Sequence, residues 1–192
     1  MIEIILRNLA YTFYPVNICA MNERSKYMNT FEFKNLIGNI NSAFADIEND
    51  GLSLQILNTF KSHEILKNIE EATLESSDRC ITYKISFFEE EVLFQFYINM
   101  SILIPYYYVY VLKNTFESKP YRWITSPQRD RQVEIEKFSL HIEMTRNILD
   151  AFNYNRFPDE LVTKVIPDIN YADVEMGKFT YFNAFFLDDV RL

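Results

Sequence analysis

The hydrophobic residues between positions 33 and 47 recur every three or four residues, the spacing of one buried face of a helix. Their positions are Leu36, Ile37, Ile40, Phe44 and Ile47. Thr30 or Asn29 can cap the start of this helix, and the Asn49-Asp50-Gly51 stretch contains the residues that commonly end one. The pattern therefore predicts a helix ending near Gly51. A second helical stretch, residues 54–69, is expected to break near Ser62 and His63.

The spacing then changes from helical to alternating. Apolar and polar residues alternate over residues 81–87 and again over residues 92–98, which is typical of half-buried strands. Glu89, Glu90 and Glu91 supply a polar turn between these two strands. A second turn at residues 99–101 is expected to lead into a third strand, residues 102–112. Three strands joined by short turns predict an antiparallel meander.

The third predicted strand contains PYYYVYV, residues 105–111. Because successive side chains of a strand point to opposite faces, one face carries Tyr106, Tyr108 and Tyr110. The other face carries Tyr107 and two valines, and it is the better candidate for the core. The three-tyrosine ladder is then either covered by another element or open to solvent. An open ladder would be the preferred binding surface, whereas a covered ladder would be only part of a strand.

The remaining segments complete an α+β prediction. Residues 1–14 are rich in β-forming residues and predict an N-terminal strand, and residues 178–187 predict a C-terminal strand that closes the sheet. Residues 114–129 are expected to form a loop, and residues 135–152 a long amphipathic helix. A short-helical or irregular stretch follows between Pro158 and Pro167. The expected fold is a single domain, 1–192, with an antiparallel sheet and helices packed on one side.

Composition and charge narrow the classes of function. The formal charge is −8, from 19 basic and 27 acidic residues, and no basic stripe offers a nucleic-acid footprint. The three glycines are isolated, so neither common phosphate-binding loop can form. No secretion leader or membrane-length apolar run is recognisable, which predicts a cytoplasmic protein with reduced cysteines. No nucleic acid, membrane or cofactor is expected as a partner.

Residues with catalytic or metal-binding chemistry are few and scattered. His63 and His141 are interpreted as surface residues, and Cys80 as a buried cysteine at the entry of a strand. The INYADVEMGKF stretch lacks the spacing of a calcium loop, and no metal site is predicted. Adjacent acids such as Asp159 and Glu160 fall in expected turns, where carboxylates are usually solvated. An enzymatic function is therefore not expected.

Acidic residues are concentrated locally. Residues 46–91 contain eleven acids against four bases, and the stretch from Asp168 adds five more acids. These acids either form a solvated face or attract a basic protein partner, with exposed aromatic residues as anchors. The candidate partner-binding residues are Glu89, Glu90, Glu91, Tyr106, Tyr108, Tyr110, Trp123, Asp168, Asp173 and Glu175.

A small, acidic, aromatic-rich α+β chain of this kind resembles the immunity proteins of bacterial polymorphic and contact-dependent toxin systems. The resemblance rests on ISFFEEEVLFQFYINMSILIPYYYVYV and IPDINYADVEMGKFTYFNAFFLDD, about half of the chain, and assigns no role to any single residue. It implies a non-enzymatic protein that binds and inhibits a cognate toxin, often a nuclease with a basic cleft. Two alternatives stay open: a small-molecule or hydrophobic-ligand binder with an apolar cavity, and an enzyme using buried carboxylates. The oligomeric state is left open.

Overall fold

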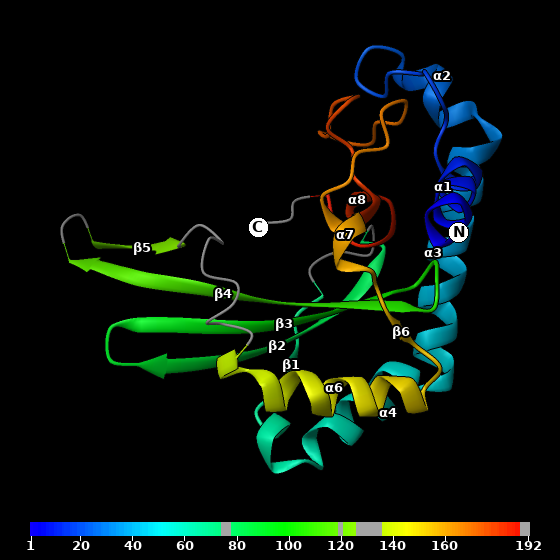
Figure 1. The fold of residues 1–192 in the computed structure, drawn as a ribbon. Coiled ribbons are helices and arrows are strands. Elements are labelled where there is room, and N and C mark those ends of the chain that lie inside the picture. The colour runs from blue at the N-terminus through cyan, green and yellow to red at the C-terminus, as the bar shows by residue number, and fades with distance from the viewer. Residues whose placement is uncertain (74–77, 119–120, 126–135, 189–192) are drawn as a thin grey trace.

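The computed structural model describes residues 1–73, 78–118, 121–125 and 136–188, and they form an α+β fold (Figure 1). The helices of the N-terminal part are α1 (Ile2–Phe13), α2 (Arg24–Asn29), α3 (Phe31–Asp50) and α4 (Leu52–Lys61), followed by the 3-10 turn η1 (Glu64–Leu66). The later helices are α6 (Ser139–Ala151), α7 (Asp159–Val162) and α8 (Tyr181–Phe185). The strands are β1 (Glu70–Glu71), β2 (Cys80–Glu89), β3 (Val92–Ser101), β4 (Tyr106–Ser118), β5 (Tyr121–Thr125) and β6 (Asn155–Arg156).

The strands form one sheet in the order β1-β2-β3-β4-β5, with every neighbouring pair antiparallel. The short β6 adds a parallel pairing beside the start of β4. The predicted β2–β3–β4 meander is confirmed. Glu89 pairs with Val92, which leaves Glu90 and Glu91 as a two-residue turn. Glu90 adopts φ +53°, a left-handed conformation that such short hairpin turns require.

Two predictions about loops in the sheet are wrong. The expected turn at residues 99–101 belongs to β3, where Asn99 pairs with Tyr108 and with Thr82 across the two neighbouring strands. The chain turns after Ser101, whose hydroxyl accepts hydrogen bonds from two backbone N–H groups of the following turn. The expected loop at residues 114–129 is instead the end of β4 and the whole of β5, as far as Thr125. In both cases polar residues occupy a strand that cross-strand pairing stabilises.

The predicted helices of the central part are confirmed. Thr30 caps α3, because its hydroxyl accepts a hydrogen bond from the Phe33 N–H at 3.2 Å. Gly51 separates α3 from α4 with φ +62°, a conformation that glycine adopts without strain. The break near Ser62 and His63 is the junction of α4 and η1. The amphipathic helix of the second half is α6, and α7 is the short helix expected between the two prolines.

The predicted terminal strands are wrong, because both segments are helices. In α1, the buried residues Leu6, Ala10 and Phe13 follow helical spacing, while the β-branched residues Ile4 and Ile5 are exposed. Two of the β-forming residues that suggested a strand, Ile4 and Ile5, therefore face solvent. In α8, Tyr181–Phe185 are buried on every side, so no alternation exists that could distinguish a strand from a buried helix.

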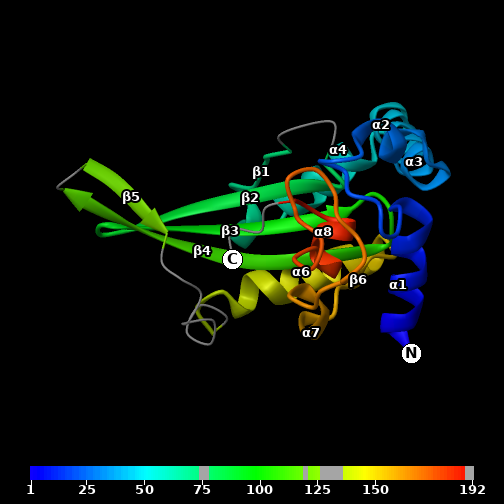
Figure 2. The same ribbon diagram turned by 90° about the horizontal axis from the view of Figure 1, so that it is seen from above.

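The two faces of the sheet belong to two hydrophobic clusters. One cluster packs α4, η1 and α6 against the face that carries Tyr107, Val109 and Val111. The other cluster packs α1, α3, α7 and α8 around the opposite face near the start of β2. The prediction of helices on one side is correct for α4 and α6, whereas α8 lies on the other face (Figures 1 and 2). Helices α1 and α3 run side by side at one end of the sheet, far from the β2–β3 hairpin turn.

Candidate functional site

A half-open pocket of about 460 Å³ lies between α2, the start of α3 and the turn at residues 171–174. Its apolar wall is formed by aromatic and methionine side chains: Met21, Tyr27, Met28, Phe33 and Tyr171. Two charged residues, Arg24 and Asp173, also line it, and both side chains are exposed. The pocket therefore combines an aromatic interior with one positive and one negative group.

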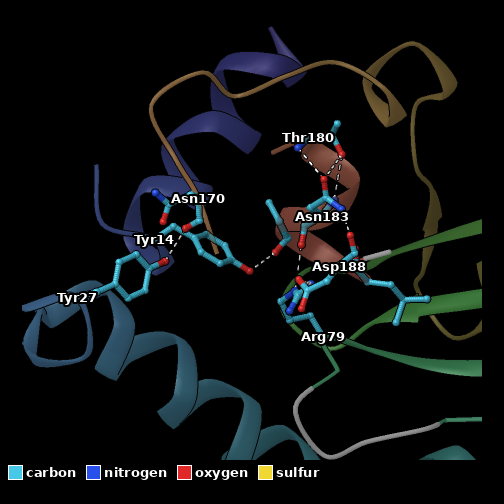
Figure 3. Close-up of polar contacts among 9 residues, drawn as sticks. Tyr14, Tyr27, Arg79, Asn170, Thr180, Asn183 and Asp188 are labelled. Atoms are coloured by element: carbon cyan, nitrogen blue, oxygen red, sulfur yellow. Dashed lines mark hydrogen bonds and ion pairs between the residues drawn. The ribbon is translucent and has the colours of Figure 1, made fainter. Parts of the chain in front are cut away.

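Hydrogen bonds join the two chain segments that form the pocket, although about 140 residues separate them. The buried Tyr27 hydroxyl donates to the Asn170 carbonyl at 2.8 Å (Figure 3). The Ala20 N–H donates to the Asn170 side-chain oxygen at 2.9 Å. The Phe33 ring packs edge-on against Tyr27, with centroids 5.5 Å apart. These contacts fix α2 against the 170–174 segment.

The turn that carries Asp173 is tight. The Val174 N–H donates to the Tyr171 carbonyl at 2.9 Å, and the Tyr171 N–H donates to the Val174 carbonyl at 3.3 Å. Between them, Ala172 has φ +48°, which costs a non-glycine residue on the order of 1 kcal/mol. Strained residues of this kind cluster at functional sites, and this one places Asp173 beside the pocket.

A buried arginine supports the pocket from the interior. Arg79, just before β2, is 1% exposed, and its guanidinium lies 4.8 Å from the centroid of the Tyr171 ring. Its Nε donates to the Asn183 carbonyl at 3.0 Å, and its Nη2 pairs with the Asp188 carboxylate at 2.5 Å (Figure 3). Arg79 therefore connects β2, the Tyr171 turn, α8 and the segment after α8.

The α8 end of this network is held by a capping box. The Thr180 hydroxyl accepts a hydrogen bond from the Asn183 N–H at 3.2 Å, and the Asn183 side-chain oxygen accepts one from the Thr180 N–H at 2.8 Å. The Asn183 side-chain amide also donates to the carbonyls of Leu187 and Asp188. This amide therefore positions the backbone that carries Asp188.

Three tyrosines around Arg79 remain neutral at ordinary pH. Burial raises the pKa of the Tyr14, Tyr27 and Tyr171 hydroxyls above the usual value. Tyr14 is fully buried, and its hydroxyl donates to the Ala184 carbonyl at 2.8 Å (Figure 3). Their roles are therefore packing and hydrogen-bond donation.

The predicted partner-binding acids of the C-terminal stretch, Asp168, Asp173 and Glu175, have three different surroundings. Asp173 lines the pocket, and Glu175 is exposed nearby in sequence, paired with Lys178 at 2.7 Å. The hydrogen bond from Lys178 lowers the pKa of Glu175. Asp168 has a structural contact, because its carboxylate accepts hydrogen bonds from the Tyr11 hydroxyl at 2.9 and 3.1 Å. Of the three acids, Asp173 alone lines the pocket.

The second predicted group lies elsewhere. Glu89, Glu90 and Glu91 are exposed at the β2–β3 turn, where Glu89 pairs with Lys137. This turn is at the opposite end of the sheet from α2 (Figures 1 and 2). The structure therefore does not bring the Glu89–Glu91 acids together with the acids of the 168–175 stretch.

The tyrosine ladder is covered at its centre. Tyr108 is 2% exposed, and its ring meets Phe182 of α8 at 5.6 Å between centroids. Tyr110 is stacked on Tyr97 at 5.0 Å, and Tyr106 packs edge-on against Phe157. Of the two alternatives for the ladder, covered by another element or open to solvent, Tyr108 shows the first. It is therefore not part of an open binding surface.

Other candidate residues have different surroundings from those expected. Trp123 lies in β5, where it pairs with Phe116, but its side chain lies outside the described part of the structure. His141 is not a surface residue, because it is half-buried among the rings of Phe87, Phe96 and Phe138. Burial lowers its pKa.

Cys80 is a fully buried cysteine at the first position of β2, as predicted. Among the described residues, no group of three or more His, Cys, Asp or Glu side chains is arranged to hold a metal ion. In the same part of the chain, no helix has the length and apolar character needed to cross a membrane.

Sequence reasoning missed Tyr27, Tyr171 and Arg79, which form or support the pocket. The only sequence signal near them is the INYADVEMGKF stretch, whose turn residues do not indicate an aromatic wall. No protein-family model, curated protein or solved structure matches the chain.

Proposed function

We propose that the protein is a non-enzymatic binding protein of the immunity type, which inhibits a toxin by binding it through the pocket face. We define the pocket face as Met21, Arg24, Tyr27, Met28, Phe33, Tyr171 and Asp173. The observation that carries the proposal is the combination, on this face, of an aromatic interior with exposed methionines and two charges, Arg24 and Asp173, whose side chains have no ion-pair partner among the described residues.

The methionines give the pocket face an unusual exposed apolar surface. Met21 is 65% exposed and Met28 is 46% exposed, although both line the pocket. Phe31, two residues before Phe33, is 78% exposed. Large apolar side chains gathered at one end of a protein often mark a protein-binding site, and methionine adapts its shape to a partner.

The charge of the chain supports a basic partner. A net charge of −8 accelerates association with a positively charged protein. The alternative of an enzyme using buried carboxylates has no candidate pair among the Asp and Glu side chains whose burial the structure describes, because none of these is buried. A partner-binding role uses exposed acids, which are present at both ends of the sheet.

The test is co-expression of this chain with the toxin candidates encoded beside it, scored by survival of the host and by co-purification. We expect one basic partner to be neutralised and to form a stoichiometric complex. Met28→Asp should weaken both effects, because it places a charge on the apolar wall. Leu140→Asp is the matched control, since Leu140 is 62% exposed on α6, outside the pocket face. Survival that is equally lost with both variants, or no partner at all, would overturn the proposal.

A second candidate function is binding of a small apolar molecule. The pocket volume of about 460 Å³ lies within the range of small-molecule sites. Native mass spectrometry of the purified protein distinguishes the two functions. A stoichiometric small molecule that Met28→Asp displaces, with no partner protein recovered, would favour this second function.

A further inference from the structure

The two charged side chains at the pocket differ in ion pairing from the charged residues next to them in the sequence. Neighbouring acids and bases neutralise each other as ion pairs on the surface: Glu23 with Lys26 at 2.8 Å and Glu175 with Lys178 at 2.7 Å. Arg24 and Asp173, which line the pocket, have no ion-pair or hydrogen-bond partner among the described residues. Within the described part of the chain, the pocket therefore presents to its occupant one cation and one anion that lack an ion-pair partner.

The aromatic wall favours an apolar occupant between these two charges. The face of an aromatic ring attracts a cation, but Arg79 already lies over the Tyr171 ring at 4.8 Å. A second cation near this ring would be repelled by the buried guanidinium. An aromatic or long aliphatic side chain meets no such repulsion and gains from burial against Tyr27, Phe33 and the methionines.

We infer that the pocket holds a segment of a partner protein that has an aromatic or long apolar side chain between one acidic and one basic residue. The apolar side chain fills the pocket, the acidic residue pairs with Arg24, and the basic residue pairs with Asp173. This inference rests on the proposed function, since it specifies which feature of the partner the pocket face recognises. It predicts a dipolar segment rather than a purely basic one.

The central apolar side chain and the two charged residues of the segment are expected to contribute unequally to affinity. Each exposed ion pair changes affinity by about two- to fivefold. Replacing the central aromatic side chain by alanine should weaken binding by about tenfold or more, because it removes most of the buried apolar area. The two charges therefore set selectivity, while the apolar side chain supplies most of the affinity.

A panel of capped five-residue peptides tests this chemistry on the isolated protein. Each peptide carries 4-fluorophenylalanine in the middle and alanine on both sides, and binding is followed by fluorine NMR. The end residues are glutamate and lysine, two glutamates, two lysines or two glutamines. We expect the glutamate–lysine peptide to bind most tightly, by about four- to twenty-fivefold over the glutamine peptide, because it forms both ion pairs and each contributes about two- to fivefold. This comparison does not depend on the direction in which the peptide lies.

Two variants of the protein, each reversing one charge at the pocket, are expected to change which peptide binds most tightly. Arg24→Glu leaves two acids at the pocket and should make the two-lysine peptide the tightest. Asp173→Lys leaves two cations and should make the two-glutamate peptide the tightest. Both positions are exposed, so thermal unfolding should stay close to that of the unmodified protein, and it serves as the control for folding.

Equal binding of all four peptides, or no binding at several millimolar, would overturn the inference. So would a ranking that the two variants leave unchanged. If the peptides fail while Met28→Asp still abolishes toxin neutralisation, the proposed function stands and the dipolar segment is wrong. If the peptides follow the expected ranking but no toxin is neutralised, the pocket chemistry stands and the proposed function falls.

Discussion

The buried ion pair between Arg79 and Asp188 provides a sharp test of how the fold is held together. Arg79 is 1% exposed, whereas the Asp188 side chain is 37% exposed. Replacing Asp188 by Asn keeps the shape of the side chain but removes its charge. The variant therefore leaves a guanidinium buried without its anion, although the Asn183 carbonyl still accepts from its Nε.

The expected loss of stability depends on how deeply each partner of the ion pair is buried. Removing one partner of a fully buried ion pair costs about 3–5 kcal/mol. Because the Asp188 side chain is partly exposed to water, this pair stabilises the fold by less than a fully buried one. We therefore expect Asp188→Asn to lower the free energy of unfolding by about 2 kcal/mol. For a chain of this length, that loss corresponds to a fall in Tm of about 4–8 °C.

The assay is a double-mutant cycle measured by urea unfolding. In an Arg79→Met background the buried charge is gone, so Asp188→Asn should change the free energy of unfolding by less than about 0.5 kcal/mol. If Asp188→Asn costs the same with Arg79 present and absent, the ion pair does not stabilise the fold. Unfolding slopes that differ between variants would show a change of the unfolded state instead.

Three further predictions use matched residues or conditions. Tyr14→Phe should lower the free energy of unfolding by about 1 kcal/mol in urea unfolding, because it removes the buried hydrogen bond to α8. Tyr107→Phe should be neutral or stabilising, since the buried Tyr107 hydroxyl has no hydrogen-bond partner in the part of the chain that the structure describes. An equal loss of stability in both variants would contradict this. Because burial lowers the pKa of His141 in the folded state, the unfolded state binds the extra proton, so stability should fall as the pH drops below about 6.5. His141→Phe should flatten that part of the stability profile between pH 5 and pH 8, and an unchanged slope would exclude His141 as its source. Glu90→Gly should raise the free energy of unfolding by about 1 kcal/mol by relieving the left-handed turn, whereas Glu91→Gly should not; a thermal melt that shows no difference between them would refute the strain argument.

The parts of the fold that could be predicted from the sequence have long, regular patterns. The helix ending at Gly51 repeats its apolar spacing over several turns, and β2 and β3 alternate over about seven residues each. The terminal segments could not be predicted in this way. In α8 all five residues are buried, and a short apolar run is compatible with a strand or a helix until its neighbours are known.

The candidate site was less predictable than the fold, because its contacts are distant in sequence. Arg79 meets Asn183 and Asp188, which are 104 and 109 positions later. A single arginine before a strand carries no local signal of such partners. Asp173 was identified through its charge, but its place beside Tyr27 depends on the hydrogen bonds of Asn170.

The pocket face divides into a buried part that also holds the fold and an exposed part that does not. The Tyr27 hydroxyl donates to the Asn170 carbonyl, and the Tyr171 ring packs against Arg79, which contacts α8. Changing either tyrosine should therefore alter folding as well as the proposed binding. Arg24, Met28 and Asp173 are exposed, and of these Arg24 and Asp173 have no polar partner among the described residues. Their side chains contribute little to folding, yet they decide the charge and shape of the pocket mouth. Under the proposed function, substitutions at these three positions should therefore change which partner is bound while leaving the stability of the fold nearly unchanged.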